Sequence, residues 1–246
     1  MDNISKPSSV IKVSNLNVKY DKNTILHNIN LQVSPGEIVG LLGPSGSGKT
    51  TLIKTIIGMT PPASGKVDLL GSSKPSLDLI SQIGYMAQSD ALYEDLTAMD
   101  NLIFFGELYG IKGKEKASEL LKLVHLENES GKFVKNFSGG MKRRLSLAIA
   151  LIHSPKILIL DEPTVGIDPL LRKGFWDEFQ RIRNEGRTII LTTHAMDEAY
   201  RCDKLFLIRE GEILAEGAPE QIISSCGAKD IEEAFLFYSM KKGGQY

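Results

Sequence analysis

Cysteine is scarce in this sequence and occurs only as Cys202 and Cys226. Two cysteines cannot form the disulfide framework of a small secreted domain, and their spacing matches no common zinc motif. A reducing compartment is therefore expected, and we predict a cytoplasmic protein.

Long apolar runs are also missing. The longest runs cover residues 38–42, 147–152 and 157–160, whereas a membrane-spanning helix needs about 18 or more predominantly apolar residues. Residues 1–9 are polar and lack the apolar segment of a signal peptide. We therefore expect any membrane role to depend on a separate partner chain.

Charge of one sign does not prevail either. The 29 lysine and arginine residues nearly balance the 30 aspartate and glutamate residues, which leaves a formal net charge of −1. This balance predicts no extended basic surface, so nucleic acid is not an expected partner. With 246 residues, 42% of them hydrophobic, the chain can bury a substantial core. Its function must therefore come from local sites.

Short apolar runs that indicate strands alternate along the chain with longer segments of helical spacing. Because strands that alternate with helices favour a parallel sheet covered on both faces, we predict an α/β fold. Helical spacing between about residues 90 and 150 interrupts the alternation and predicts an inserted lobe. The predicted strands are 10–13, 16–20, 31–33, 37–42, 66–70, 83–86, 156–160, 188–192, 206–208 and 213–215, and the predicted helices lie within 49–58, 97–125, 139–153, 170–184 and 231–240.

The strongest local motif is Gly43-Pro44-Ser45-Gly46-Ser47-Gly48-Lys49-Thr50, which matches the pattern GxxxxGK[ST] at every position. It follows a buried strand and opens a helix, the context that a phosphate-binding loop requires. Its glycines let backbone N–H groups turn toward an anion, and the helix N-terminus adds a partial positive charge. Lys49 can reach the β- and γ-phosphates, and the Thr50 hydroxyl can bind Mg²⁺. We therefore predict MgATP binding, with Thr51 included in the nucleotide-binding set.

A second motif, Ile157-Leu158-Ile159-Leu160-Asp161-Glu162, is an apolar strand that ends in two carboxylates. Asp161 is expected to bind Mg²⁺ beside Thr50. Glu162, one residue further, can orient the attacking water and accept its proton as a general base. The two motifs together predict hydrolysis of ATP.

A third motif, Asn136-Phe137-Ser138-Gly139-Gly140-Met141-Lys142-Arg143-Arg144, stands directly before a long helical segment. It resembles the signature sequence of ABC ATPases, usually LSGGQ, except that phenylalanine replaces the leucine and methionine replaces the glutamine. Ser138 suits a helix N-cap, and Gly139 and Gly140 permit close approach to an anion. The three basic residues that end the motif are expected on a solvated or interface surface rather than on phosphate.

The resemblance to ABC ATPases implies a site shared between subunits. The Ser-Gly-Gly core would contact the γ-phosphate of an ATP molecule held by the other subunit. One chain carries one phosphate-binding loop and one signature. The implied assembly is therefore two chains around two ATP molecules, the second being another copy or a close homologue.

Further positions follow the order of the same family. Tyr20 stands at the place of the aromatic residue that stacks on adenine. Gln88 matches the glutamine that links Mg²⁺ and the attacking water to the helical lobe, and Asp168 lies in a segment resembling the loop that contacts the opposite subunit. His194 resembles the switch histidine that contacts the γ-phosphate and steadies the catalytic glutamate. The implied catalytic set is Glu162, His194 and Gln88, and the implied Mg²⁺ set is Thr50, Gln88 and Asp161.

The family also implies a fold, namely a P-loop NTPase with a RecA-like parallel-sheet core, an antiparallel β subdomain and an inserted α-helical subdomain. We expect one ABC ATPase domain over residues 1–246. The expected parts are 1–35 and 63–75 for most of the β subdomain, 36–62, 76–90 and 151–217 for the core, 91–150 for the helical subdomain with the signature, and 218–246 for the C-terminal helices.

Three functions are compatible with a phosphate-binding loop. The first is the ATPase subunit of a membrane exporter whose permease is a separate integral-membrane chain, which would place this chain on the inner face of the cell membrane. The second is a non-transport ABC ATPase that acts on ribosomes or DNA, and the third is an unrelated P-loop kinase or GTPase.

The sequence favours the first function. A kinase or GTPase would not supply the signature, and the guanine-reading motif of GTPases, Asn/Thr-Lys-x-Asp, is absent. Non-transport ABC proteins usually carry two ATPase cores or a long coiled-coil insertion, and neither occurs in this sequence. Residues 104–110, 138–144 and 231–235 resemble the drug-resistance and lipid-export branch, so we expect an exporter of drugs or lipophilic compounds.

Overall fold

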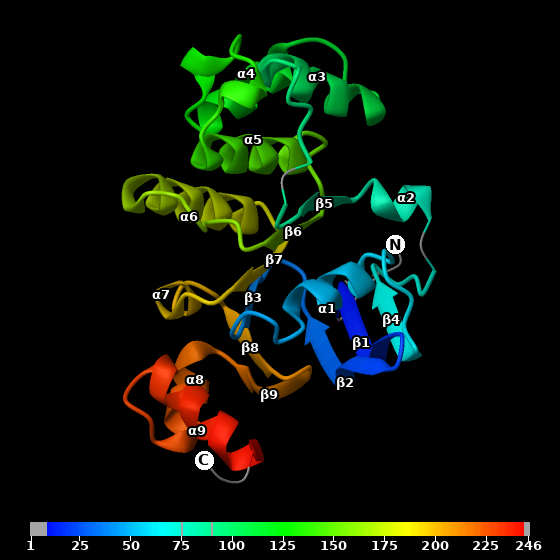
Figure 1. Ribbon diagram of the computed structural model, residues 1–246, viewed down its shortest axis with the longest axis vertical. Helices are drawn as coiled ribbons and strands as arrows, with labels where there is room; N and C mark the ends of the chain where they lie inside the picture. Colours follow the sequence, from blue (N-terminus) through cyan, green and yellow to red (C-terminus); the bar gives the residue numbers. More distant parts are fainter. Residues whose placement is uncertain (1–8, 75, 90, 244–246) are drawn as a thin grey trace, which may run out of the picture.

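The computed structural model describes residues 9–74, 76–89 and 91–243. These residues form two β-sheets with helices packed around them (Figure 1). The expected α/β fold with a parallel core sheet is confirmed. Part of the predicted N-terminal β region, residues 1–8, lies outside the described residues.

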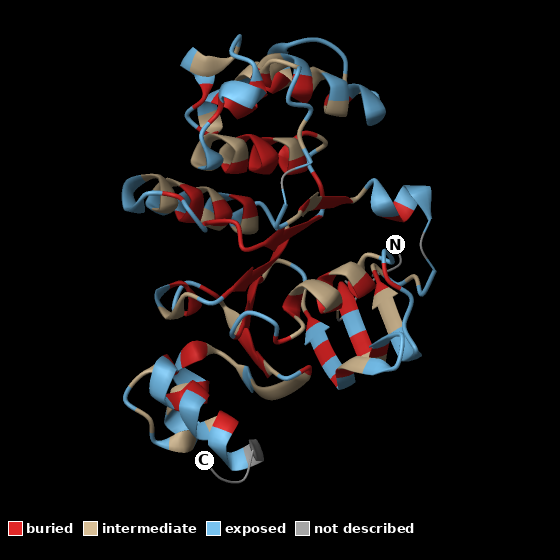
Figure 2. Cartoon of the chain, viewed as in Figure 1, coloured by how far each residue is buried: buried red, intermediate tan, exposed pale blue. Residues whose placement is uncertain are grey.

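The larger sheet has six strands in the order β5-β6-β7-β3-β8-β9. Its first five strands are parallel and nearly all their residues are buried, because both faces of the sheet are covered (Figure 2). The last strand runs antiparallel at one edge, after a turn at Gly211. The strands are β3 (Ile38–Leu42), β5 (Ile83–Met86), β6 (Ile157–Asp161), β7 (Thr188–Thr193), β8 (Lys204–Arg209) and β9 (Glu212–Gly217).

Alternate residues of these strands belong to two separate cores. Leu158 and Leu160 of β6 face one core, together with α5 (Gly139–Leu151) and α6 (Pro169–Asn184). Ile157 and Ile159 face the other core, which contains α1 (Lys49–Ile56) and the smaller sheet. The parallel sheet is therefore the layer that holds the helical part and the antiparallel part together.

The smaller sheet is antiparallel and has the order β2-β1-β4. Strands β1 (Ile11–Tyr20) and β2 (Asn23–Val33) are longer than predicted, and β4 (Ser64–Leu69) begins two residues early. The boundaries predicted for the three short N-terminal strands were wrong, because β1 joins the first two of them and β2 extends the third. Polar residues inside the strands look like turns, but Asn15 and Asn28 have φ of +49° and lie at shifts in the β1–β2 register. Asparagine tolerates this left-handed conformation. The polar residues therefore lie at irregularities within continuous strands rather than in turns between strands.

The inserted helical segment contains α3 (Ala98–Leu108), α4 (Glu115–Leu123) and α5. The helical spacing predicted over residues 97–125 is divided by a turn in which Gly110 has φ of +74°. Thr97 begins α3 as its N-cap, because its side chain accepts a hydrogen bond from the backbone N–H of Asp100. Short helices α2 (Leu77–Ile80) and α7 (Met196–Ala199) lie beside the large sheet.

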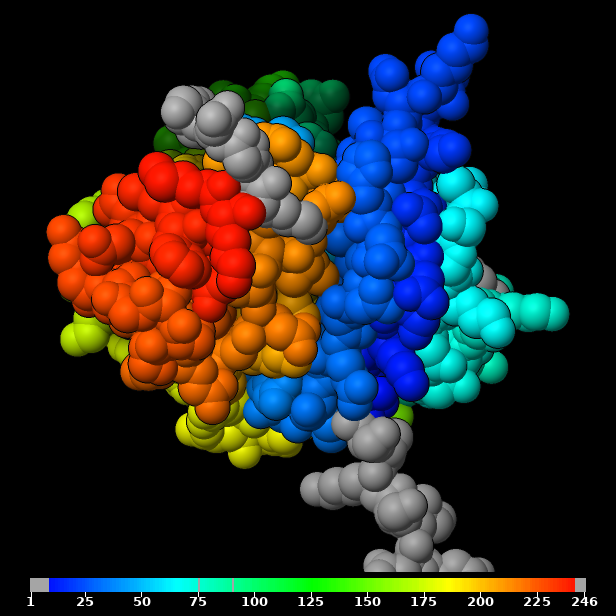
Figure 3. All heavy atoms as spheres, turned by 90° about the horizontal axis from the view of Figure 1, so that it is seen from below, coloured from blue at the N-terminus to red at the C-terminus, as the bar shows by residue number. Residues whose placement is uncertain are grey.

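The C-terminal part forms α8 (Pro219–Cys226) and α9 (Ile231–Gly243). Figure 3 shows these helices beside the β8–β9 strands, which adjoin the N-terminal strands on their other side. A hydrogen bond of 2.8 Å from the His27 N–H to the Gly211 carbonyl joins the two sheets there. None of the described helices combines the length and apolar character that a membrane crossing needs. Both cysteines are free thiols, with Cys202 buried and Cys226 half-buried.

Candidate nucleotide-binding and catalytic site

The loop between β3 and α1 has the shape of an anion-binding cradle. Gly43 has no room for a side chain, since a Cβ atom would lie 2.1 Å from the Ile208 carbonyl oxygen. Gly48 is the N-cap of α1 with φ of +102°, so no side chain caps the first N–H groups of the helix. The Ser47 hydroxyl is buried, and no described residue offers it a hydrogen-bond partner. A bound phosphate would satisfy these groups, so the loop fits the predicted ligand.

Lys49 places a buried cation inside this cradle. Only 5% of the residue is exposed, and its Nζ atom donates to the carbonyl oxygens of Gly43 at 2.7 Å and Pro44 at 2.9 Å. Burial lowers the pKa of Lys49 below the ordinary 10.5, and the nearby Glu162 and Asp161 oppose that shift. The phosphate groups of ATP would add further negative charge beside this buried ammonium.

Thr50 and Asp161 form the part of the site that fits Mg²⁺. The Thr50 hydroxyl donates to Oδ2 of Asp161 at 2.8 Å, and the Thr192 hydroxyl donates to Oδ1 at 2.6 Å. Asp161 is almost fully buried at 1% exposure. A hydroxyl and a single carboxylate, completed by phosphate oxygens and water, form a typical Mg²⁺ site in nucleotide-binding proteins.

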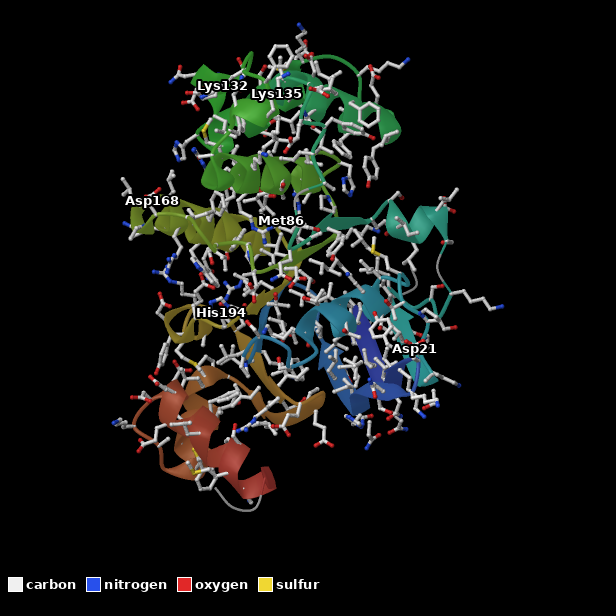
Figure 4. All side chains as sticks on the ribbon, in the orientation of Figure 1. Asp21, Met86, Lys132, Lys135, Asp168 and His194 are labelled. Carbon is white, nitrogen blue, oxygen red and sulfur yellow. The ribbon has the colours of Figure 1, made fainter. Side chains whose placement is uncertain are left out.

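Glu162 lies between the two other residues predicted to be catalytic. Its Oε1 atom is 3.3 Å from Nδ1 of His194, and its Oε2 atom accepts a hydrogen bond of 3.4 Å from the Gln88 amide. The side chain of Glu162 is 11% exposed and that of His194 is 50% exposed, so the carboxylate is largely shielded from solvent while the imidazole is half exposed. Figure 4 labels Met86, the last residue of β5, and His194, which directly follows β7, and it shows both near the middle of the molecule. Gln88 thus contacts the proposed base directly, rather than the Thr50–Asp161 pair.

The signature residues lie away from the phosphate-binding loop, at the start of α5. Ser138 is the N-cap of α5, where its hydroxyl accepts a 3.3 Å hydrogen bond from the Met141 N–H. Ser138 and Gly139 are exposed, and a Cβ atom added to Gly139 would meet nothing within 4 Å. Figure 1 shows α5 and α1 in separate parts of the molecule, so the chain does not bring the signature to its own phosphate-binding loop.

Two further predicted residues lie outside the hydrogen-bonded cluster. Tyr20 ends β1 with 47% of its surface exposed, and its hydroxyl is 3.2 Å from that of Thr60. Asp168 is exposed at the start of α6, where its side chain accepts from the N–H groups of Leu170 and Leu171 at 3.1 Å each. Asp168 therefore has a local capping role whatever else it contacts. Thr51 lies in the first turn of α1, beside Lys49 and Thr50.

Arg143 was expected on a solvated or interface surface, and this prediction was wrong. Arg143 is buried at 6% exposure, and its guanidinium donates to the backbone carbonyl oxygens of Gln88 and Glu162. Its spacing was the available signal, because Arg143, Leu147 and Ala150 recur at the period of a helix and all three are buried. Lys142 does lie near the surface, where it forms an ion pair with Glu94.

Comparison with known proteins identifies the family. The model of a family described as ABC transporter matches residues 26–165. The chain is 38% identical over 235 residues to the Nod factor export ATP-binding protein I of Paraburkholderia xenovorans, covering 93% of this chain and 77% of that protein. It is 42% identical over 231 residues to ABC transporter G family member 20 of Dictyostelium discoideum, covering 92% of this chain but only 32% of that longer protein.

A solved structure agrees with these relatives. A dimeric, post-hydrolysis ATP-binding cassette bound to ADP and phosphate superposes with a TM-score of 0.78 at 26% identity, covering 85% of this chain and 98% of the other. The fold, the phosphate-binding loop and the comparisons lead to one conclusion. This chain belongs to the ABC transporter family, and it is one of the ATP-binding domains that hydrolyse ATP in that family.

Proposed function

We propose that this chain is the ATPase subunit of an ABC exporter, and that it hydrolyses ATP in an assembly of two such subunits around two MgATP molecules. One observation is the main support for a catalytic site shared between two chains. The signature begins α5 with Ser138 and Gly139 exposed and Gly140 half-buried, and this helix start is separated from the chain's own phosphate-binding loop. Gly139 has open space where its Cβ atom would be. An uncovered helix terminus of this kind suits the γ-phosphate bound by a second chain.

The proposed roles follow from the contacts in the site. Lys49 and the N-terminus of α1 would hold the β- and γ-phosphates, and half-exposed Tyr20 would stack on the adenine. Thr50 and Asp161 would hold Mg²⁺, with Gln88 nearby, and the ion would offset the charge of the phosphates. The Glu162 carboxylate would accept a proton from water while the water oxygen bonds to the γ-phosphorus and the bond to the ADP oxygen breaks. His194 and Gln88 would keep that carboxylate oriented.

Mixing two inactive variants tests the shared site. Lys49→Ala removes the cation in the phosphate-binding loop, and Ser138→Arg places bulk and charge at the signature. In a mixed dimer one composite site carries both changes and the other carries neither, so the mixture should hydrolyse ATP although each pure variant does not. Hydrolysis by a demonstrated monomer would contradict the proposal.

Export through a separate permease is the second element of the proposal. The names of the Nod factor relatives describe export ATP-binding proteins, which supports a role in export. The described helical segment also exposes apolar residues that a membrane protein could cover, including Tyr93, Phe104 and Leu108. The ring centroids of Tyr93 and Phe104 are 4.8 Å apart, so these two residues form one continuous surface. A drug or lipophilic substrate stays a prediction from the sequence.

Pull-down from detergent-solubilised membranes tests the partner. Pull-down of the chain should recover a multi-span membrane protein, in a complex that contains two copies of the chain. In the cell, the chain would lie at the cytoplasmic face of the membrane in this complex. Leu108→Glu should weaken that recovery and leave basal ATPase activity nearly intact, whereas Leu236→Glu, an exposed leucine on α9, should have little effect. Recovery of ribosomes or DNA-repair factors without a membrane protein would replace this proposal with a non-transport function.

A further inference from the structure

Arg143 connects the signature helix to the ends of β5 and β6, which are followed by Gln88 and Glu162. It lies in α5, whose N-cap is Ser138. Its Nη1 atom donates to the carbonyl oxygens of Ala87 at 2.7 Å and Gln88 at 3.1 Å. Its Nη2 atom donates to the carbonyl oxygen of Glu162 at 2.7 Å and also to that of Asp161. One buried side chain thus bonds to the backbone after β5 and at the end of β6.

Arginine suits this position for a geometric reason. Strands β5 and β6 are neighbours and parallel, so the peptide groups at their carboxyl ends lie side by side. Buried carbonyl groups need donors. A planar guanidinium offers several N–H donors in a fixed fork, whereas lysine offers one compact ammonium on a flexible stem. Replacement by lysine would therefore lose part of the set of hydrogen bonds.

The contact with Glu162 is the one that bears on catalysis. Glu162 has φ of +52°, a left-handed conformation that costs free energy in a residue with a Cβ atom. Its N–H donates to the Thr192 hydroxyl at 2.9 Å, and its carbonyl accepts from Arg143 at 2.7 Å. A side chain from β7 thus holds one side of this peptide unit, and a side chain from α5 holds the other.

We propose that Arg143 is a positioning residue, which keeps the Glu162 carboxylate in its working orientation and makes that orientation depend on the placement of α5. The inference rests on the proposed role of Glu162 as the base. A movement of the helical segment that displaced α5 would pull on the carbonyl groups of Glu162 and Gln88 together. The signature helix of one chain would in this way control the base of the same chain.

Arg144 supplies a matched control on the same helix. Its Nη1 atom donates to the carbonyl oxygens of Val124 at 3.1 Å and His125 at 2.8 Å, next to the C-terminal end of α4. It therefore makes the same kind of contact, a guanidinium on two backbone carbonyls, but within the helical segment. A loss that came only from weakened packing of α5 should follow either substitution.

The test compares kcat per folded molecule and the Kd for MgATP in Arg143→Met, Arg143→Lys and Arg144→Met, with thermal unfolding as a stability control. For Arg143→Met we expect kcat to fall on the order of 10²-fold, because a displacement of about 1 Å in a catalytic group can have that effect. Its Kd for MgATP should stay within about twofold, since the carbonyl oxygens of Gln88 and Glu162, to which its guanidinium donates, lie outside the phosphate-binding loop. Arg143→Lys should show a smaller fall, and Arg144→Met should keep kcat.

Two results would overturn the inference. The first is an unchanged kcat in Arg143→Lys or Arg143→Met while Glu162→Gln is inactive. The second is an equal fall in Arg143→Met and Arg144→Met. If Glu162→Gln itself turned over at the normal rate, the failure would lie in the assignment of the base under the proposed function, and Arg143 would have no base to position.

Discussion

The hydroxyl of Thr50 donates a 2.8 Å hydrogen bond to the carboxylate of Asp161, although 111 residues separate them in the sequence. Thr50 lies after β3, and Asp161 is the last residue of β6. In the parallel sheet, β7 lies between these two strands. The carboxyl ends of parallel strands meet at one edge of a sheet, where ligands of open α/β folds bind. Two motifs that the sequence shows separately therefore form one site.

Glu162→Gln should lower turnover by about 10²–10⁴-fold, because the amide keeps the size of the side chain but cannot accept a proton. Binding of MgATP should survive, since Lys49 and the loop at α1 are unchanged. Steady-state ATPase assays and equilibrium binding measure the two quantities. Normal turnover in this variant would remove Glu162 from the catalytic set.

Thr192→Val should lower the free energy of unfolding of the protein in the absence of nucleotide. The hydroxyl of Thr192 bonds to both Asp161 and the Glu162 N–H, and the valine has nearly the same shape. Each buried polar group left without a partner costs about 1–3 kcal/mol in the free energy of unfolding. Urea denaturation should show this loss, and Thr192→Ser, which keeps a hydroxyl, should recover most of it. A valine variant as stable as the wild type would mean that water replaces the threonine.

Tyr20→Ala should weaken nucleotide binding by about 1–3 kcal/mol, the range for stacking of a base on an aromatic ring. Tyr20→Trp should bind nearly as well as the wild type. Tyr20→Phe removes only the hydroxyl near Thr60 and should also bind well. Titration with MgATP gives the affinities. If Tyr20→Ala and Tyr20→Trp both unfold the protein while affinity per folded molecule stays constant, Tyr20 is a packing residue.

As pH rises, the affinity for ATP should begin to fall at a lower pH than it would if Lys49 had the ordinary lysine pKa of 10.5. Burial lowers the pKa of Lys49 below 10.5, so in the protein without nucleotide the ammonium loses its proton at a lower pH. Bound phosphate favours the charged form, so binding in this alkaline range should take up a proton and weaken as pH rises. Lys49→Arg, which stays charged, serves as the control for binding at each pH. Parallel pH profiles for the wild type and this variant would contradict the assignment.

The sequence predicted those parts of the site that depend on local patterns. The loop Gly43–Thr50 and the strand ending at Asp161 are continuous motifs, and the structure places both at the edge of the parallel sheet. The extent of β1 and β2 was wrong because register shifts hide polar residues inside the strands. The prediction for Arg143 was wrong because its partners, the backbone carbonyl groups of Gln88 and Glu162, are 55 and 19 residues away in the sequence. A charged side chain on a buried helical face reveals its role only when the fold brings those partners together.

The mass of Glu162→Gln in the presence of MgATP, measured by light scattering after gel filtration, tests the central claim most directly. If the catalytic site is shared, this slowly hydrolysing variant should elute with the mass of two chains. Adding Ser138→Arg to the same chain should return the mass to one chain, because the signature then cannot approach the partner's γ-phosphate. A mass of one chain for Glu162→Gln, at concentrations where the wild type hydrolyses ATP as a monomer, would contradict the account.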